Sequence, residues 1–227
     1  MRIFTFWEGE MPPYIKLCMK TWKFDYTVLN YDNLNDYTSL DILSLQKFTL
    51  PQVADIVRVH VLRDNGGYWI DTDTIMLKNE LPKENMIGNP VERTQTIGYL
   101  YTPFVNDPLF VEWAKFQDNV IQNKYPPFGW NAVGNAFTDT YVKEHKEVTI
   151  ADVTNCWAET YMISGDMPRW KKYGQFYFEQ NYHKWDLRDT NMLMLHNSWT
   201  PCWYKRLSES EVLGQTRTLS NILKELL

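Results

Sequence analysis

The chain has 227 residues, of which 44% are hydrophobic and 22% charged, a balance that favours an ordered globule and argues against extensive disorder. Its formal net charge of -5 argues against general electrostatic affinity for nucleic acid or anionic membranes, because such binding needs clustered Lys and Arg. The cysteines are widely spaced and form no Cys-x-x-Cys pattern, so they indicate reduced thiols and no zinc site: Cys18, Cys156 and Cys202.

The first thirty residues predict a strand, a helix and a second strand. Met1 to Trp7 is a short apolar run of β-prone residues, which places Trp7 at the end of a buried strand. Residues 12–24 begin with two prolines and have the length of a helix, and Tyr26 to Tyr31 is typical of a strand. The early acidic residues argue against a signal peptide, and no apolar run reaches the length of a membrane span. We therefore expect a cytoplasmic protein.

The next segment predicts an amphipathic helix over residues 51–65. Its apolar side chains recur on one helical face: Val53, Val57 and Val61. Pro51 suits the first turn of a helix, and the pair Gly66-Gly67 suits a left-handed stop.

A pair of carboxylates follows this helix. The segment from Tyr68 to Leu77 is aromatic and β-branched, which predicts one strand. Because residues two apart in a strand face the same side, Asp71 and Asp73 are expected to converge on one spot. A hard divalent cation such as Mg²⁺ or Mn²⁺ would relieve their repulsion and leave coordination positions for phosphate oxygens. Alone, an Asp-x-Asp pattern is more often a solvated strand end.

The preceding helix strengthens the interpretation of a functional site. Asp55 and Arg58 lie one turn apart, on a different face from the valines, so both side chains can reach a shared site. Strand, helix and strand alternate in this half of the chain, which predicts an α/β layered fold. Beyond residue 90 the signals are weaker, although Ser220 to Leu227 has the pattern of a short closing helix.

Taken together, these motifs resemble glycosyltransferase family 32, and the core is also similar to that of the large clostridial glucosylating toxins. The resemblance rests on Asp55 to Arg58, Gly66-Gly67-Tyr68, Asp71-x-Asp73, an N-terminal Phe-Trp-Glu-Gly ending at Gly9, and a late His-Asn-Ser-Trp ending at Trp199. It implies a GT-A fold with a Rossmann-like nucleotide-binding sandwich in a single domain over residues 1–227. Residues 1–80 would form the nucleotide-binding half and residues 81–227 the acceptor-side half with the C-terminal helix.

The resemblance also implies roles for the early residues. It places Asp71 on ribose and metal-bound water, Asp73 directly on the metal, and Asp55 and Arg58 on the sugar hydroxyls and phosphate of the donor. Tyr68 would border the nucleoside. Trp7 would stack on uracil, with a buried core tryptophan as the equal alternative.

The late motif would complete the site. The resemblance implies a metal ligand among His196, Asn197 and Ser198 and a cap over the diphosphate from Trp199, although a lone histidine is more often structural. The implied cofactor is Mn²⁺ or Mg²⁺, and the implied donor is a UDP-sugar. Transfer would proceed with retention of configuration to a glycan, a lipid-linked intermediate or a protein.

Three further expectations remain open. A haloacid-dehalogenase-like phosphatase using the Asp71-x-Asp73-x motif is an alternative, but that family has the motif on its first strand, whereas 70 residues precede it here. A non-catalytic carbohydrate-binding module would explain the aromatic content but not the acidic group. The apolar stripe of the C-terminal helix is expected to pack on the chain itself, with a dimer contact or peripheral attachment at the inner membrane face as alternatives: Leu219, Ile222, Leu223 and Leu226.

Overall fold

The computed structural model describes residues 2–152, 168–181 and 190–227. The prediction for Cys156 lies outside these ranges, whereas Cys18 and Cys202 carry free thiols. Two compact units are interleaved along the chain. Unit 1 comprises Met1–Gly9, Asp25–Asp71 and Pro82–Asp152, and unit 2 comprises Glu10–Phe24, Thr72–Leu81 and Val153–Leu227. The units therefore do not follow a division at residue 80, and the single-domain organisation stays a prediction.

Unit 1 is built on a six-stranded sheet with the strand order β2-β1-β3-β6-β5-β7. The strands are β1 (Ile3–Phe6), β2 (Thr27–Leu29), β3 (Gly67–Ile70), β5 (Met86–Asn89), β6 (Thr94–Thr102) and β7 (Ile150–Asp152). β1 is parallel to both β2 and β3, whereas β6 is antiparallel to β3 and β5. β5 and β7 are parallel. The predicted N-terminal strands and the α/β class are confirmed.

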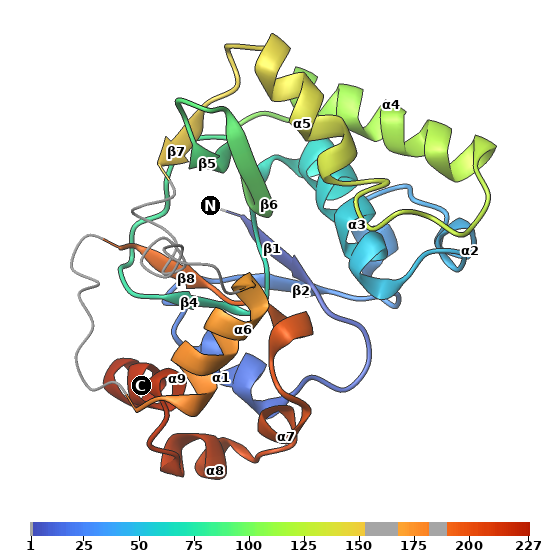
Figure 1. The fold of residues 1–227 in the computed structure, drawn as a ribbon. Helices are drawn as coiled ribbons and strands as arrows, with labels where there is room; N and C mark the ends of the chain where they lie inside the picture. Colours follow the sequence, from blue (N-terminus) through green and yellow to red (C-terminus); the bar gives the residue numbers. More distant parts are fainter. Residues whose placement is uncertain (1, 153–167, 182–189) are drawn as a thin grey trace. The chain divides into compact units, whose positions relative to one another are not determined.

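The helices of unit 1 gather on one side of this sheet (Figure 1). They are α2 (Ile42–Leu45), α3 (Leu50–Asn65), α4 (Pro108–Asn123) and α5 (Asn135–Glu144), with a short 3₁₀ turn, η1 (Leu34–Asp36). Apolar side chains from α3 and α4 and from the facing strands share one core, which includes Val57, Trp69, Leu100 and Trp113. Burial of this surface supplies the main driving force for folding.

Helix α3 matches its prediction closely. Its N-terminus has a capping box between Thr49 and Gln52, and Val53, Val57 and Val61 are fully buried. The chain leaves the helix through two glycines with φ of 62° and 96°. A side chain at Gly67 would also overlap the carbonyl oxygen of Arg2, because an added Cβ would lie 2.5 Å from it. The two glycines thus let β3 start directly beside β1.

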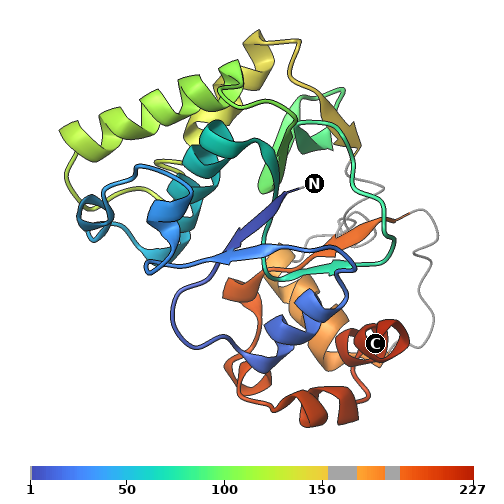
Figure 2. The same ribbon diagram turned by 180° about the vertical axis from the view of Figure 1, so that it is seen from behind.

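Unit 2 combines a two-stranded antiparallel sheet with several helices (Figure 2). The strands are β4 (Thr74–Met76) and β8 (Met192–Met194). The helical elements are α1 (Pro13–Lys20), α6 (Arg169–Gly174), η4 (Gln175–Glu179), η5 (Asn197–Trp199), α7 (Cys202–Lys205), α8 (Glu209–Gly214) and α9 (Thr218–Leu226). No helix within the described ranges is long and apolar enough to cross a membrane.

The prediction of one strand from Tyr68 to Leu77 is wrong. β3 ends at Ile70, Thr72 and Asp73 form a turn, and β4 begins at Thr74. The two strands pair in different sheets, so the local β-propensity of this segment is overridden by two separate pairings. Asp71 and Asp73 consequently do not share a strand face, and Asp71 ends a segment of unit 1 while Asp73 belongs to unit 2.

The C-terminal helix packs as expected on its own chain. Leu219, Ile222 and Leu223 of α9 are buried, and the helix contacts η4 and α8 within unit 2. The Ser220 hydroxyl lies 2.9 Å from the Tyr204 hydroxyl, which adds a polar contact between α9 and α7. The apolar stripe is therefore covered inside unit 2, apart from the partly exposed Leu226.

Candidate functional site

Arg58 is the centre of a buried ionic cluster in unit 1. Its Nη2 atom lies 2.9 Å from Oδ1 of Asp55, one turn earlier on α3, and 3.3 Å from Oδ1 of Asp71 after β3. Its Nε donates to the Ala54 carbonyl at 3.2 Å, and its Nη1 donates to the carbonyl of Ile97 on β6. Only 5% of the side chain is exposed. The guanidinium is therefore committed to protein acceptors, and it brings the predicted Asp55 and Asp71 together.

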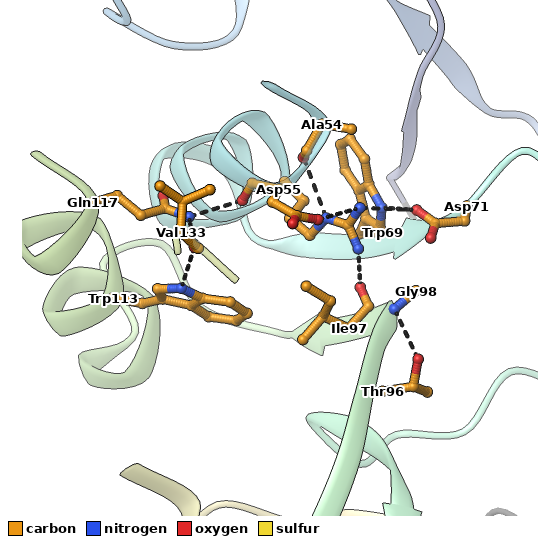
Figure 3. Close-up of polar contacts among 11 residues, drawn as sticks. Ala54, Asp55, Trp69, Asp71, Thr96, Ile97, Gly98, Trp113, Gln117 and Val133 are labelled. Carbon is orange, nitrogen blue, oxygen red and sulfur yellow. Dashed lines mark hydrogen bonds and ion pairs between the residues drawn. The ribbon is translucent and has the colours of Figure 1, made fainter. Parts of the chain in front are cut away.

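Trp69 completes the surroundings of Asp71 (Figure 3). Its indole Nε1 donates to Oδ1 of Asp71 at 2.8 Å, and its ring centre lies 5.2 Å from the Arg58 guanidinium carbon. The backbone N–H of Asp71 donates to the Gly98 carbonyl at 2.9 Å. Side chains two residues apart in an extended chain face the same side, and here this spacing brings Asp71 beside Trp69. Trp69 was not among the predicted site residues, although the same two-residue spacing points to it.

The carboxyl of Asp55 is a weaker acid than usual, with a raised pKa. Burial raises its pKa to about 6, against the opposing effect of the Arg58 charge, and the nearby charge of Asp71 raises it further. This carboxyl therefore changes protonation close to neutral pH. Such a group suits a role in binding polar substrates, because its charge responds to what lies beside it.

A set of buried hydrogen bonds ties Asp55 to helix α4 and to the loop before α5 (Figure 3). Nε2 of Gln117 donates to the Asp55 carbonyl at 2.8 Å and to the Val133 carbonyl at 2.6 Å. The Trp113 indole also donates to the Val133 carbonyl, at 3.1 Å. The next residue, Gly134, is so close that an added Cβ would lie 2.9 Å from Oδ2 of Asp55. These residues were not predicted, because they are distant from Asp55 in the chain and follow no motif.

In unit 2, Asp73 meets the late motif. Its Oδ2 accepts a hydrogen bond of 2.7 Å from the backbone N–H of Asn197, which is 124 residues away in the chain. The Asp73 carbonyl accepts from the N–H of Leu195 at 3.1 Å, in continuation of the β4–β8 pairing. The strand pairing thus places Asp73 beside the segment from His196 to Trp199.

The remaining members of the late motif differ in their surroundings. The ring of His196 lies 4.0 Å from that of Trp199, and both rings also contact Tyr173. Ser198 is exposed, whereas the side chain of Asn197 accepts a hydrogen bond of 2.6 Å from the Tyr14 hydroxyl. Tilted and edge-on ring contacts join His196 and Trp199 to Tyr173, and Asn197 is the member in direct contact with Asp73.

Two predicted nucleoside contacts have distinct placements in unit 1. Tyr68 is buried on β3 and stacks on Tyr101 with ring centres 4.3 Å apart, so it faces protein in this structure. Burial raises its pKa to about 12. Trp7 follows β1 as predicted, with a partly exposed side chain, and its Nε1 is a buried donor that has no partner among the described residues. Trp7 is therefore better placed than Tyr68 to meet a ligand.

The candidate metal ligands in unit 2 are mainly oxygen atoms, and few of them belong to acidic side chains. Within the described residues, no group of three or more His, Cys, Asp or Glu side chains could hold a metal ion by itself. A carboxylate at Asp73, an amide at Asn197 and a hydroxyl at Ser198 are hard oxygen donors. Oxygen donors of these types suit Mg²⁺ or Mn²⁺, which are bound in phosphate-handling sites through one or two carboxylates with the substrate and water supplying further oxygens.

One family profile and one solved structure show similarity to this chain. The profile of a family described as "Capsular polysaccharide synthesis protein" matches residues 1–97, the segment that contains Asp55, Arg58, Asp71 and Asp73. No curated protein sequence gives a significant match. Among solved structures, the chain is similar to an active-site mutant of LgtC, with 11% identity, a TM-score of 0.44 and coverage of 100% of both chains.

Proposed function

We propose that this chain is a metal-dependent glycosyltransferase of the GT-A type, which transfers a sugar from a UDP-sugar to a glycan, lipid-linked or protein acceptor. The observation that carries the proposal is the pairing of the Asp-x-Asp acids with the other segments of the family resemblance. Asp71 contacts Arg58, which also contacts Asp55, and Asp73 contacts Asn197 of the late motif. In each unit, one of the two acids thus contacts another segment of the resemblance.

The match to capsular polysaccharide synthesis proteins gives independent support, since its matched range includes both acids. It favours a sugar nucleotide as the donor and a growing glycan as one class of acceptor. Asp71 would contact ribose and metal-bound water, and Asp73 would bind the metal, with Asn197, Ser198 or His196 as a further ligand. Trp7 would stack on the base, and Trp199 would cover the diphosphate.

We assign Arg58 a different role from the phosphate contact that the resemblance implies. Its guanidinium is buried and contacts two carbonyls and two carboxylates, which leaves at most one of its five N–H groups for a phosphate. Arg58 would instead fix the orientation of Asp55 and Asp71 and offset their negative charge. Asp55 would then accept hydrogen bonds from hydroxyl groups of the donor sugar, as an ionised carboxylate does.

The bound metal would supply the positive charge that offsets the developing charge on the departing nucleoside diphosphate. The chain's own residues would hold the acceptor hydroxyl close to the anomeric carbon, and such positioning lowers the barrier by several kcal/mol. Retention of configuration, implied by the resemblance, would result from attack on the face that the diphosphate leaves. No protein nucleophile is needed in such a transfer.

The proposal is tested by incubating the full chain with a panel of UDP-sugars, with Mn²⁺ and with EDTA, and measuring UDP release. A glycosyltransferase releases UDP from at least one donor only when Mn²⁺ is present. Hydrolysis of phosphomonoesters with no UDP release would favour the phosphatase. Glycan binding without turnover of either substrate would favour the carbohydrate-binding module.

A further inference from the structure

A group of buried hydroxyls lies behind the late motif in unit 2. Tyr14 on α1, Tyr173 on α6 and Thr200 after η5 come from distant parts of the chain and are each at most 3% exposed. Apolar replacements would fill the same space, so the hydroxyl groups must be explained by their hydrogen bonds. Burying a polar group costs free energy unless the group forms hydrogen bonds.

Two of these hydroxyls hold the backbone of His196. The Tyr173 hydroxyl accepts from the His196 N–H at 3.1 Å and lies 3.3 Å from Oγ1 of Thr200. The Thr200 hydroxyl donates to the His196 carbonyl at 3.1 Å. The peptide groups on both sides of His196 are thereby hydrogen-bonded to the Tyr173 and Thr200 hydroxyls, which also contact each other.

The third hydroxyl reaches the residue that contacts Asp73. Tyr14 donates to Oδ1 of Asn197 at 2.6 Å, and the Asn197 N–H donates to Oδ2 of Asp73 at 2.7 Å. A single residue therefore lies between Tyr14 and the second acid of the Asp-x-Asp motif. Because the Tyr14 bond engages the side chain and the Asp73 bond engages the backbone, Asn197 is restrained at both ends.

The local electrostatics keep these hydroxyls protonated. Burial raises the pKa of Tyr14 well above its usual range, and the negative charge of Asp73 raises it further. Burial likewise raises the pKa of Tyr173. Tyr14 thus remains a hydrogen-bond donor over the whole physiological pH range, and its effect does not depend on titration.

We propose that Tyr14, with Tyr173 and Thr200 behind it, is a positioning residue that orients Asn197 against Asp73 for binding of the divalent metal and diphosphate. This inference rests on the proposed function, because it concerns the same metal. It predicts that the Tyr14 hydroxyl affects metal affinity although it does not touch the metal. Groups that orient metal ligands change metal affinity by roughly 10- to 100-fold.

The unit contains a matched control for this prediction. Tyr204 is also fully buried, its ring lies 5.8 Å from that of Tyr14, and its hydroxyl bonds to Ser220 rather than to the late motif. Tyr14→Phe and Tyr204→Phe each remove one buried hydroxyl from the same packed region. Only the first removes a hydroxyl that contacts Asn197.

The experiment measures Mn²⁺ binding in the presence of UDP by the electron paramagnetic resonance signal of free Mn²⁺, together with the melting temperature of each protein. We expect Tyr14→Phe to weaken Mn²⁺ binding about tenfold, and Tyr204→Phe to leave the affinity within about twofold of wild type at a similar loss of thermal stability. Thr200→Val, which keeps the side-chain shape, should also weaken binding and serves as the second variant if Tyr14→Phe does not fold.

The possible results distinguish a failure of the positioning role of Tyr14 from a failure of the metal-dependent function. Mn²⁺ binding by wild type with unchanged affinity in both Tyr14→Phe and Thr200→Val would overturn the positioning role alone. Equal weakening in Tyr14→Phe and Tyr204→Phe would also overturn it, because the effect would then follow general packing. Failure of the wild-type chain to bind Mn²⁺ with UDP would overturn the metal-dependent function, and the positioning role with it.

Discussion

The two acids of the Asp-x-Asp motif are held in contrasting ways. Asp71 belongs to an ionic cluster in unit 1, where the buried guanidinium of Arg58 and the indole of Trp69 contact the same carboxylate oxygen. The Asp73 side chain in unit 2 accepts a hydrogen bond from the backbone N–H of Asn197, whose side chain in turn accepts one from the Tyr14 hydroxyl. Two acids that look alike in the sequence therefore have different described contacts, because Asp71 lies beside a cation and Asp73 beside a backbone N–H group.

This difference separates charge compensation from orientation. Removing the cation in unit 1 leaves the mostly buried carboxylate of Asp55 and the partly exposed carboxylate of Asp71 without a positive partner, so its main effect should be on stability and on the pKa of Asp55. Removing a dipole in unit 2 changes the direction of a ligand, so its main effect should be on metal affinity. Three substitutions in unit 1 test this contrast.

Arg58→Ala should have the largest effect on stability. It leaves Asp55 and Asp71 without their cation and the Ile97 carbonyl without its donor, which should lower the free energy of unfolding by about 3–5 kcal/mol. Turnover should fall more than metal affinity. Arg63→Ala is the control on the same helix, because its partly exposed pair with Asp64 should be worth at most about 1 kcal/mol. Urea denaturation compares them.

A double substitution sharpens this test. If the loss in Arg58→Ala comes from uncompensated charge, adding Asp55→Asn should restore part of the free energy of unfolding. Additive losses in the double variant would indicate that Arg58 acts through packing against Trp69 and not through its charge.

Asp55→Asn should have an intermediate effect that depends on pH. Because the folded-state pKa of about 6 is above the usual value near 4, folding favours the protonated carboxyl, and wild type loses stability as the pH rises through this window. The Asn variant cannot ionise. Its stability relative to wild type should therefore increase between pH 4 and pH 7, on the order of 2–3 kcal/mol, while its turnover falls.

Urea denaturation at both pH values measures this difference. A constant difference in the free energy of unfolding across the window would contradict the raised pKa. In wild type, kcat/KM should fall as the pH drops below about 6, because the ionised carboxylate is the hydrogen-bond acceptor in the proposed role.

Gly134→Ala should have the smallest effect on stability and a specific effect on turnover. The added Cβ would lie 2.7 Å from Cδ1 of Ile97 and 2.9 Å from Oδ2 of Asp55, so one of these groups must shift. We expect a loss of about 1–2 kcal/mol in stability and about tenfold in turnover. Gly129→Ala is the control in the preceding loop, because a Cβ there meets nothing within 4 Å.

The cause of a loss in Gly134→Ala can be assigned with a second change. Ile97→Val removes the Cδ1 atom that an added Cβ would meet first. If displacement of Asp55 lowers turnover, Gly134→Ala/Ile97→Val should regain stability but not activity. Full recovery of kcat/KM in the double variant would show that the contact with Asp55 is unimportant.

The features that could be predicted from the sequence follow from residues close together in the chain. Helix α3, its first-turn proline and its glycine stop follow from spacing within fifteen residues, and the same spacing places Asp55 and Arg58 on one side of the helix. The turn at Thr72 and Asp73 was not predictable in this way, because Thr72 and Thr74 are β-branched and favour an extended chain on either side of the break. The position of the break is set by the pairing of β4 with β8, which is far away in the sequence.

The contacts that hold the candidate site were the least predictable. Tyr14 and Asn197 are 183 residues apart, and Gln117 and Asp55 are 62 residues apart. A tyrosine or glutamine in a helix has no local signature that reveals its partner. The resemblance identified the acids and the late motif, but only the fold identifies the hydroxyls and amides that orient them.

The role of Asp73 in metal-dependent transfer is tested most directly by measuring Mn²⁺-dependent release of UDP from a UDP-sugar by Asp73→Ala and by wild type. We expect turnover to fall roughly a thousandfold, because metal-ion charge stabilisation is worth several kcal/mol, and metal-dependent UDP binding to be lost. The melting temperature should remain close to that of wild type. Near-normal, Mn²⁺-dependent turnover by a folded Asp73→Ala protein would contradict the account.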